Sequence, residues 1–514
     1  MKVVSIEEAV AAIKDRSTMV ITGFTGCIVP DYILKGIEDA FVSGGKPNNL
    51  TLVWNNSITG GEGLGSDRLA HNGLITKAIS AHLNLMPKMQ AMVDREEIPC
   101  NILPLGCMTQ LYREIGRGSP GLITKIGLGT FIDPRIAGGK ANSITTDDLV
   151  EVMEINGEEY LFYKSFPIDV AVIRGTTIDT HGNLSCEREV ALTDGLAAAS
   201  AVKRSGGIVI AQVENVCAFG SISPRDIYVP GIMIDYAVVS PPEFHPMAMG
   251  HAEYIDALAH KHRVELGSLP PLPMNERKIM ARRAAMELRA GQIVNLGFGV
   301  PEGIASIAAE AGIADKMILT VEVGQVGGVP CGGPLFGASY NSEYCTDMTR
   351  MMDWYEGRAL DLAFLGAVEV DSCGNTNVTK IGKTIGPGGY INIAQTAKKM
   401  CFCGALTAKG LKVEAKDGKL VIESEGKLKK YVPDVEQISF SGKTAIKENQ
   451  EVLYITERAV FRQTPDGPML IEIAPGIDLQ TQVLDQIAFD IKVSPELKIM
   501  DERIFREEAM YLDI

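Results

Sequence analysis

One carboxylate, Glu322, stands where an apolar stretch turns into a run of glycines, within residues 318–334, which read ILTVEVGQVGGVPCGGP. The apolar part has the length and composition of a β-strand and predicts a strand with Glu322 near its carboxyl end. Open α/β sheets keep their active sites at that edge, and glycines without a Cβ let a ligand approach the backbone closely. A glutamate at a strand end is also commonly just solvated. This stretch alone therefore makes Glu322 a candidate and no more.

A second glycine-rich stretch, IGPGGYIN at residues 385–392, follows Lys380 and Lys383. Backbone N–H groups in such a loop can point together and stabilise an oxyanion. A plain flexible loop is the alternative interpretation of the same pattern. The loop is therefore a candidate partner for a nucleophile elsewhere in the chain.

A third stretch, GFGVPEG at residues 297–303, has glycines at Gly297 and Gly299. The GxGxxG spacing of dinucleotide-binding loops fails because Glu302 takes the place of the third glycine, which disfavours a nicotinamide-dependent reductase. The pattern predicts a strand-to-helix turn with Pro301 at the first helical position, whose N–H groups could meet an anion. An ordinary α/β turn fits this motif equally well.

A lone carboxylate in a glycine-walled cleft can act as a nucleophile, because its ordinary pKa of about 4.3 leaves it ionised at neutral pH. Attack on a thioester gives an acyl anhydride, and thiolate attack on that anhydride gives an enzyme-bound thioester. Both steps pass through tetrahedral oxyanions, which N–H donors stabilise by roughly 3–4 kcal/mol each. The chain has no GxSxG elbow, no GxxxxGK[ST] loop and no histidine pairs at metal-ligand spacing, so we expect no metal site.

Composition bounds the class of protein. At 514 residues the chain is long enough for two or more domains, and its 53 glycines suit an α/β protein with many tight turns. The net charge of −15 disfavours nucleic acid and anionic membranes as partners. There is no signal peptide and no apolar run near 18 residues, and the ten cysteines are scattered, so we expect a cytoplasmic protein with reduced thiols.

An internal repeat indicates how these stretches are positioned. Residues 169–185 (DVAVIRGTTIDTHGNLS) align without a gap to 361–377 (DLAFLGAVEVDSCGNTN), and the Gly-Phe pair at residue 23 recurs at residue 297. The two offsets differ, which predicts an insertion at about 85–160 in the first half. We expect an α/β fold with two similar open α/β domains, 1–240 and 275–514, joined by a linker at 241–274, with a cleft between them.

The chain resembles the family I coenzyme A transferases over nearly its full length, most closely the single-chain propionate or acetate type. The stretches that carry the resemblance are TGF (22–24), IGLGTFIDPRIAGGK (126–140), VNLGFGVPE (294–302), LTVEVGQVGGVPCGG (319–333), FGASYN (336–341), GNTNVTK (374–380), GPGGYINI (386–393) and YITERAVF…LIEIAPGID (454–478). The resemblance implies a site between the two domains and ping-pong transfer of CoA between short-chain carboxylic acids. No tightly bound cofactor is implied, since CoA is a substrate, and a homodimer or homotetramer is expected.

By the same resemblance, Glu322 matches the catalytic glutamate that forms the glutamyl-CoA thioester, and Gly388 or Gly389 matches the backbone of the oxyanion hole. Several family members also carry a Pro-Gln-Gly turn whose glutamine donates to the oxyanion. Here the turn is Pro-Leu-Gly at residues 104–106, and the side chain of Leu105 cannot donate. The second donor is expected from the backbone of residues 104–107 or from Gln110.

The leading hypothesis is an acyl-CoA:carboxylate CoA-transferase acting on acyl-CoA and small carboxylic acids, with Lys380, Lys383, Gly297 and Gly299 as candidate contacts for CoA. An acyl-CoA hydrolase on the same scaffold is the first alternative. A non-catalytic effector-binding protein of related fold is the second. Propionate, acetate, butyrate, lactate, acrylate or a larger aromatic acid are all compatible with the sequence.

Overall fold

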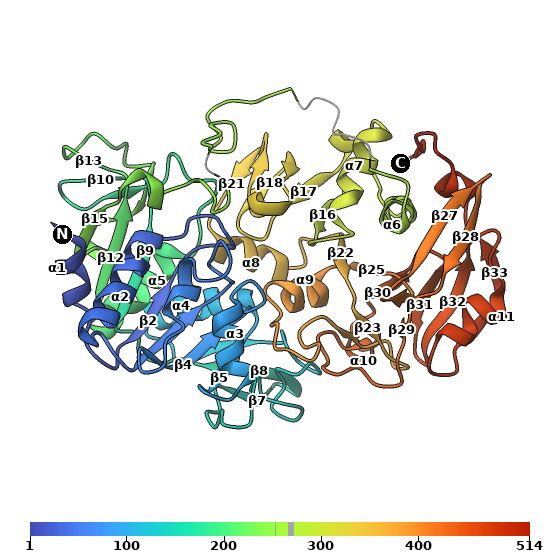
Figure 1. Ribbon diagram of the computed structural model, residues 1–514, viewed down its shortest axis with the longest axis horizontal. Helices are drawn as coiled ribbons and strands as arrows, with labels where there is room; N and C mark the ends of the chain where they lie inside the picture. The colour runs from blue at the N-terminus through green and yellow to red at the C-terminus, as the bar shows by residue number, and fades with distance from the viewer. Residues whose placement is uncertain (252, 266–271) are drawn as a thin grey trace.

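The computed structural model describes residues 1–251, 253–265 and 272–514, and it forms two α/β halves that lie side by side (Figure 1). An eight-stranded sheet organises the first half, in the order β1-β15-β12-β9-β2-β3-β4-β5. A ten-stranded sheet organises the second, in the order β21-β18-β17-β16-β22-β25-β30-β31-β32-β33. Neighbouring strands of the first sheet are all parallel, so their carboxyl ends share an edge.

The helices and strands of the first half are β1 (Lys2–Val3), α1 (Ile6–Ala11), β2 (Thr18–Ile21), α2 (Asp31–Gly44), β3 (Leu50–Trp54), β4 (Ile75–Ser80), α3 (Pro87–Asp94), β5 (Cys100–Ile102), α4 (Leu105–Arg117), β6 (Gly121–Thr124), β7 (Val150–Ile155), β8 (Glu158–Lys164), β9 (Val170–Arg174), β10 (Thr177–Asp179), β11 (Leu184–Ser185), α5 (Gly195–Ser205), β12 (Ile208–Val213), β13 (Asn215–Cys217), β14 (Ile227–Val229) and β15 (Tyr236–Val239). A capping box between Ser5 and Glu8 begins α1, with each side chain bonded to the other residue's N–H.

The helices and strands of the second half are α6 (Glu276–Ala285), β16 (Ile293–Leu296), α7 (Glu302–Glu310), β17 (Ile318–Thr320), β18 (Gln325–Val326), β19 (Val329–Pro330), β20 (Ser339–Tyr340), β21 (Tyr344–Cys345), α8 (Met348–Glu356), β22 (Leu362–Gly366), β23 (Glu369–Val370), β24 (Thr376–Asn377), α9 (Tyr390–Thr396), β25 (Lys399–Cys403), β26 (Thr407–Ala408), β27 (Lys412–Lys416), β28 (Lys419–Ser424), β29 (Leu428–Lys429), α10 (Gly442–Lys447), β30 (Glu451–Ile455), β31 (Ala459–Thr464), β32 (Gly467–Ile473), α11 (Leu479–Gln482) and β33 (Lys492–Ile499). The side chain of Asn275 caps the N-terminus of α6.

Strand order confirms the internal duplication. The first sheet contains the run β3-β2-β9-β12-β15 and the second contains β17-β16-β22-β25-β30, with each strand in the same place relative to its neighbours. The aligned segments of the sequence repeat become β9 and β22. Between β3 and β9 the first half also carries β4, α3, β5, α4 and a three-stranded sheet of β6, β8 and β7, in the region of the predicted insertion.

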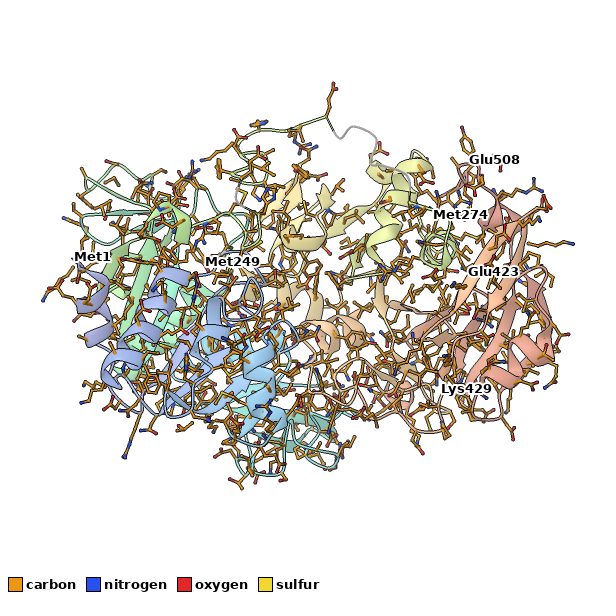
Figure 2. All side chains as sticks on the ribbon, in the orientation of Figure 1. Met1, Met249, Met274, Glu423, Lys429 and Glu508 are labelled. Carbon is orange, nitrogen blue, oxygen red and sulfur yellow. The ribbon has the colours of Figure 1, made fainter. Side chains whose placement is uncertain are left out.

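The two halves meet along helices α4, α8 and α9 (Figure 1), where the hydroxyl groups of Thr109 and Thr349 lie 2.6 Å apart. Within the predicted linker at 241–274, Met249 lies on the first half and Met274 on the second (Figure 2). Residues 252 and 266–271 of that linker lie outside the described residues. No helix in the part of the chain that the structure describes is long and apolar enough to cross a membrane.

Candidate active site

Glu322 lies two residues beyond the carboxyl end of β17, in a tight turn closed by the bond from Gly324 N–H to Val321 O (2.9 Å). The strand is shorter than the apolar sequence suggests, because the chain reverses here to begin β18. Gly324 makes this turn possible: its φ is +131°, and a Cβ at this position would lie 1.9 Å from the carbonyl oxygen of Thr346. The nucleophile candidate therefore projects from the sheet edge where the site was expected.

The carboxylate of Glu322 rests above a buried polar network. Burial raises the pKa of Glu322, and a hydrogen bond from the Asn295 side chain on β16 opposes that rise. The hydroxyl of Tyr355 donates to Thr320 Oγ1 (2.8 Å), and Asn295 Nδ2 lies 3.3 Å from the same tyrosine oxygen. Asn295 is not among the site residues expected from the sequence. Its polar amide stands in an otherwise apolar strand, and this contrast is the signal that could have identified it.

The glycine loop at 386–389 lies against Glu322. A Cβ on Gly389 would sit 3.7 Å from Cγ of Glu322 and 3.8 Å from Cε of Met352. The N–H of Gly388 donates to the carbonyl oxygen of Ala81 at 2.8 Å, whereas the N–H of Gly389 has no acceptor among the described residues. Gly389 also begins α9, so its N–H is one of the unpaired donors that every helix leaves at its first turn. Of the two candidate glycines, only Gly389 thus has an N–H available to a ligand.

The turn at residues 104–106 of the first half docks onto this loop. The N–H of Leu105 donates to Gly388 O (2.9 Å), and the N–H of Gly106 donates to Asn392 Oδ1 (3.0 Å). Pro104 has no N–H. The backbone of this turn is therefore used to join the halves, and its Leu105 side chain is fully buried.

Gln110 lies one turn further along α4, at the interface with α8. Its Nε2 donates to Asp353 Oδ1 at 3.1 Å, and its side chain is almost fully buried there. Its Oε1 has no hydrogen-bond partner among the described residues. The structure gives no contact between Gln110 and Glu322 within the ranges it describes, so these two candidates are not brought together.

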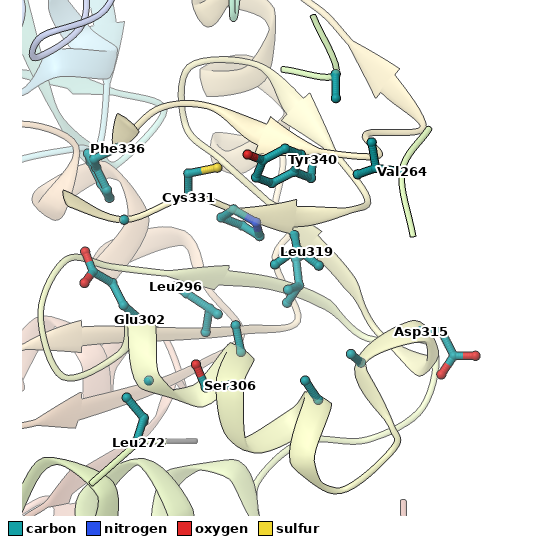
Figure 3. A pocket seen from close by; sticks show the side chains of 18 of the residues that line it. Val264, Leu272, Leu296, Glu302, Ser306, Asp315, Leu319, Cys331, Phe336 and Tyr340 are labelled. Atoms are coloured by element: carbon teal, nitrogen blue, oxygen red, sulfur yellow. The ribbon is translucent and has the colours of Figure 1, made fainter. Parts of the chain in front are cut away.

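A cavity of about 1150 Å³ opens on the α7 side of the sheet, and Gly299 lines it together with Leu296 and Leu319 (Figure 3). Cys331, Phe336 and Tyr340 form one wall in Figure 3, opposite Glu302 and Ser306. Side chains of successive strand residues face opposite sides. The cavity therefore lies on one face of β16 and β17, and the network below Glu322 lies on the other.

The turn at Gly297–Gly299 already faces a carboxylate. Burial raises the pKa of Glu302, the backbone N–H of Gly299 opposes that rise, and Glu302 Oε1 has no hydrogen-bond partner among the described residues. An incoming phosphate would meet this acidic side chain at the start of α7. The turn is therefore better suited to an uncharged part of a ligand than to an anion.

Lys380 and Lys383 lie on a different surface, on the loop that leads into residues 385–389. This loop packs against α3 of the first half, where Thr384 N–H donates to Asp94 (3.0 Å) and Gln90 Nε2 donates to Thr384 O (2.6 Å). Lys383 is exposed, and neither lysine lines the cavity that contains Gly299. The structure thus separates the glycine and lysine candidates. Within residues 1–251, 253–265 and 272–514, no cluster of three or more His, Cys, Asp and Glu side chains could hold a metal ion.

Comparison with known proteins identifies a family and several similar proteins. The profile of a family described as Coenzyme A transferase matches residues 3–240. The chain is 45% identical to the caffeate CoA-transferase of Acetobacterium woodii, over 100% of this chain and 99% of that protein. It is 40% identical to the acetate CoA-transferase YdiF of Escherichia coli K12, over 99% and 96% of the two chains. A crystal structure of YdiF from E. coli O157:H7, described as a thioester complex with CoA, superposes with a TM-score of 0.94 at 38% identity and covers 100% of this chain and 98% of that one.

Proposed function

The chain belongs to the coenzyme A transferase family and is an enzyme that transfers CoA from an acyl-CoA to a carboxylate; we propose that the transfer proceeds through a thioester on Glu322. The observation that supports this most directly is the pairing of an ionisable carboxylate with an N–H that has no acceptor. Cγ of Glu322 lies 3.7 Å from the position of a Cβ on Gly389, and the Gly389 N–H has no acceptor among the described residues.

The reaction needs only this carboxylate and hydrogen-bond donors. A carboxylate oxygen of Glu322 attacks the thioester carbonyl carbon, the resulting oxyanion collapses, and the CoA thiolate leaves a mixed anhydride behind. The thiolate then attacks the glutamyl carbonyl of that anhydride, which releases the first carboxylate and leaves glutamyl-CoA. The acceptor carboxylate repeats the same steps in reverse order, so no proton has to be added or removed on the main path.

The Gly389 N–H serves as an oxyanion donor in each of these steps. A donor aimed at developing charge in a partly buried site is worth about 3–4 kcal/mol, because it needs no reorganisation when the charge forms. Burial of Glu322 also makes its carboxylate a stronger base and nucleophile than an exposed one, since raising a pKa destabilises the charged form. The Asn295 hydrogen bond favours the ionised form of the carboxylate, which is the form that attacks.

CoA is a substrate here, and remote contacts with its long arm supply binding energy for the reacting thioester. We assign the cavity beside Gly297 and Gly299 to the uncharged part of this arm, because the carboxylate of Glu302 already faces the turn. Lys380 and Lys383 are assigned to CoA phosphates, since they form a separate cationic loop next to the catalytic glycines. A double Lys380→Ala/Lys383→Ala variant should raise the KM for acyl-CoA with little change in kcat.

The acids come from the carboxylate class, and short-chain acids such as acetate, propionate and butyrate are our first assignment. The two named relatives act on chemically different acids by their names, acetate and caffeate. A panel of acceptors that includes lactate, acrylate and caffeate with one donor acyl-CoA would rank them by kcat/KM. A homodimer or homotetramer is proposed alongside, and a native mass measurement would decide between these and a monomer.

The decisive experiment is covalent trapping. The enzyme is incubated with an acyl-CoA, reduced with borohydride and digested, and the modified peptide is located by mass spectrometry. Reduction at Glu322 supports the proposal, and modification at another residue would overturn the site. Release of free CoA without an acceptor acid would favour a hydrolase, and the absence of both adduct and turnover would favour a ligand-binding protein. Glu322→Gln, checked for native folding, is the control and should yield no adduct.

A further inference from the structure

The oxyanion hole proposed above has one identified donor, and three of the other candidates near it already make a hydrogen bond. The N–H groups of Leu105 and Gly106 are bonded to the second half, and Gln110 Nε2 is bonded to Asp353. A tetrahedral oxyanion held by a single N–H would forgo roughly 3–4 kcal/mol of available stabilisation. A donor from another element would supply this stabilisation.

His82 packs against the same glycine loop as Glu322. It follows β4, and its neighbours hold the loop in place: Gly388 N–H donates to Ala81 O (2.8 Å), and Leu83 N–H donates to Ile385 O (2.8 Å). A Cβ on Gly388 would lie 3.9 Å from Cδ2 of the His82 ring, just as a Cβ on the next residue would lie 3.7 Å from Cγ of Glu322. The imidazole and the carboxylate thus border consecutive residues of one loop.

Hydrogen bonds around His82 determine which ring nitrogen carries the proton. Ser57 Oγ lies 2.8 Å from Nδ1 and 3.2 Å from the carbonyl oxygen of His82. That carbonyl oxygen already accepts from Trp54 Nε1 (3.2 Å) and from Ser80 Oγ (3.1 Å), which uses both of its lone pairs. The Ser57 hydroxyl hydrogen is therefore directed to Nδ1, and the neutral ring carries its hydrogen on Nε2.

The Nε2–H group is left for a ligand. Nε2 has no hydrogen-bond partner among the described residues, and His82 as a whole is half-buried. Burial lowers the pKa of His82 to about 4, which keeps the ring neutral at physiological pH. A neutral imidazole is a hydrogen-bond donor that does not protonate the nucleophile or the leaving thiolate, as a more acidic imidazolium could.

We propose that His82 Nε2–H is the second oxyanion donor of this enzyme, acting with Gly389 N–H in the place that Leu105 leaves without one. This inference rests on the proposed transfer through Glu322. When the glutamate attacks the thioester, the carbonyl oxygen gains negative charge and accepts both N–H groups. The two bonds weaken again when the CoA thiolate leaves and the carbonyl re-forms. His82 neither gains nor loses a proton in the cycle, and Ser57 is a positioning residue that holds the tautomer.

Three variants separate a donor from a packing role. His82→Phe keeps a ring of similar size without a donor, His82→Gln keeps an N–H close to the position of Nε2, and Ser57→Ala removes only the hydrogen bond to Nδ1. The measured quantity is the single-turnover rate of thioester formation on Glu322 from acyl-CoA. We expect His82→Phe to lower this rate about 10²–10³-fold with a small change in KM. His82→Gln should recover most of the loss, and Ser57→Ala should show a smaller fall than His82→Phe.

The pH dependence of the single-turnover rate is a further measurement, and a role of His82 in packing alone would not affect it. Wild-type enzyme should show no titration with the ordinary histidine pKa of about 6.5 in its single-turnover rate. An unchanged rate in His82→Phe, or equal losses in His82→Phe and His82→Gln with native thermal stability, would overturn the proposal. If His82→Phe fails to fold, an unchanged rate in Ser57→Ala or a histidine titration in wild type would do so instead. Failure of the parent mechanism is distinct, because wild-type enzyme would then form no adduct on Glu322.

Discussion

Gly106 and Asn392 join the two halves of the molecule next to the nucleophile: the N–H of Gly106 donates to Asn392 Oδ1 at 3.0 Å, and Asn392 Nδ2 donates to Glu356 Oε1 at 3.0 Å. Gly106 begins α4 in the first half, and Asn392 lies in α9 in the second. The glycine loop at 386–389 is thus held by residues that are far apart in the sequence. The geometry of the site depends on this contact.

Substitution of Gly106 by alanine should therefore damage both stability and activity. A Cβ at this position would lie 2.4 Å from Asn392 Nδ2 and 2.9 Å from Met352 Sδ, so the start of α4 must move away. We expect a loss of about 1–3 kcal/mol in the free energy of unfolding and slower transfer. Chemical denaturation and steady-state assays measure the two effects. Gly44→Ala is the matched control, because a Cβ there meets nothing within 4 Å, and an equal loss in both variants would refute the packing argument.

Gly389 offers a test of its N–H that leaves the backbone shape in place. Its φ is −80°, which proline accepts, so Gly389→Pro deletes the donor while keeping this angle. We expect kcat to fall about 10²–10³-fold. Gly389→Ala retains the N–H, and its Cβ would make ordinary contacts of 3.4 Å with Ile393 and 3.7 Å with Glu322, so its kcat should stay much closer to wild type. Similar losses in the two variants would show that bulk, not the donor, matters.

Asn295 should help to determine the pH below which the enzyme loses activity. Its hydrogen bond favours the charged form of Glu322 and opposes the rise in pKa that burial causes. Asn295→Leu should therefore raise this pKa further, and the nucleophile will be lost to protonation at a higher pH. The acid limb of kcat/KM, which reports the free enzyme, should move to higher pH. Thr320→Val is the control because Thr320 bonds Tyr355 and Val294 O; an equal shift there would contradict the assignment.

The environment of Glu189 allows a prediction of how the stability of the fold depends on pH in the acidic range. Its carboxylate is buried with Arg174 (2.9 and 3.0 Å) and His245 (3.2 Å); burial raises its pKa, but these partners outweigh burial and lower the pKa to about 2. A depressed pKa contributes stability that is fully present above the unfolded value of about 4.3 and is lost as the pH falls towards 2.

Glu189→Gln should accordingly lower the free energy of unfolding by about 3 kcal/mol at pH 7, because it leaves Arg174 buried without its charge partner. The difference from wild type should shrink below pH 4.3, because the Glu189 carboxylate of the unfolded wild-type chain becomes protonated there while that of the folded protein stays charged until about pH 2. Urea midpoints at pH 7, 4.5 and 3 would measure this trend. Asp466→Asn, at an exposed ion pair with Lys492, should leave the midpoint unchanged at all three values. A pH-independent difference for Glu189→Gln would argue against the predicted shift in pKa.

Glu322 could be identified as a candidate site residue from the sequence because the signal is local. A buried strand and a glycine-rich turn can be recognised from consecutive residues, because backbone conformation depends mainly on neighbours along the chain. The duplication could be found for a related reason: two copies of one sheet repeat the same burial pattern at a fixed offset. The family resemblance follows from the same local stretches taken together.

Tertiary structure decided which groups surround that glutamate. Gly388 and Gly389 are indistinguishable as letters, and only the carbonyl of Ala81, some three hundred residues earlier, occupies the N–H of the first and leaves that of the second. Gln110 looked able to donate to the site until Asp353 proved to hold its amide nitrogen. Asn295 and His82 carried no motif at all. Hydrogen bonds between distant segments depend on how the two halves dock. The sequence pattern of one segment does not show which residue of the other half will become its partner.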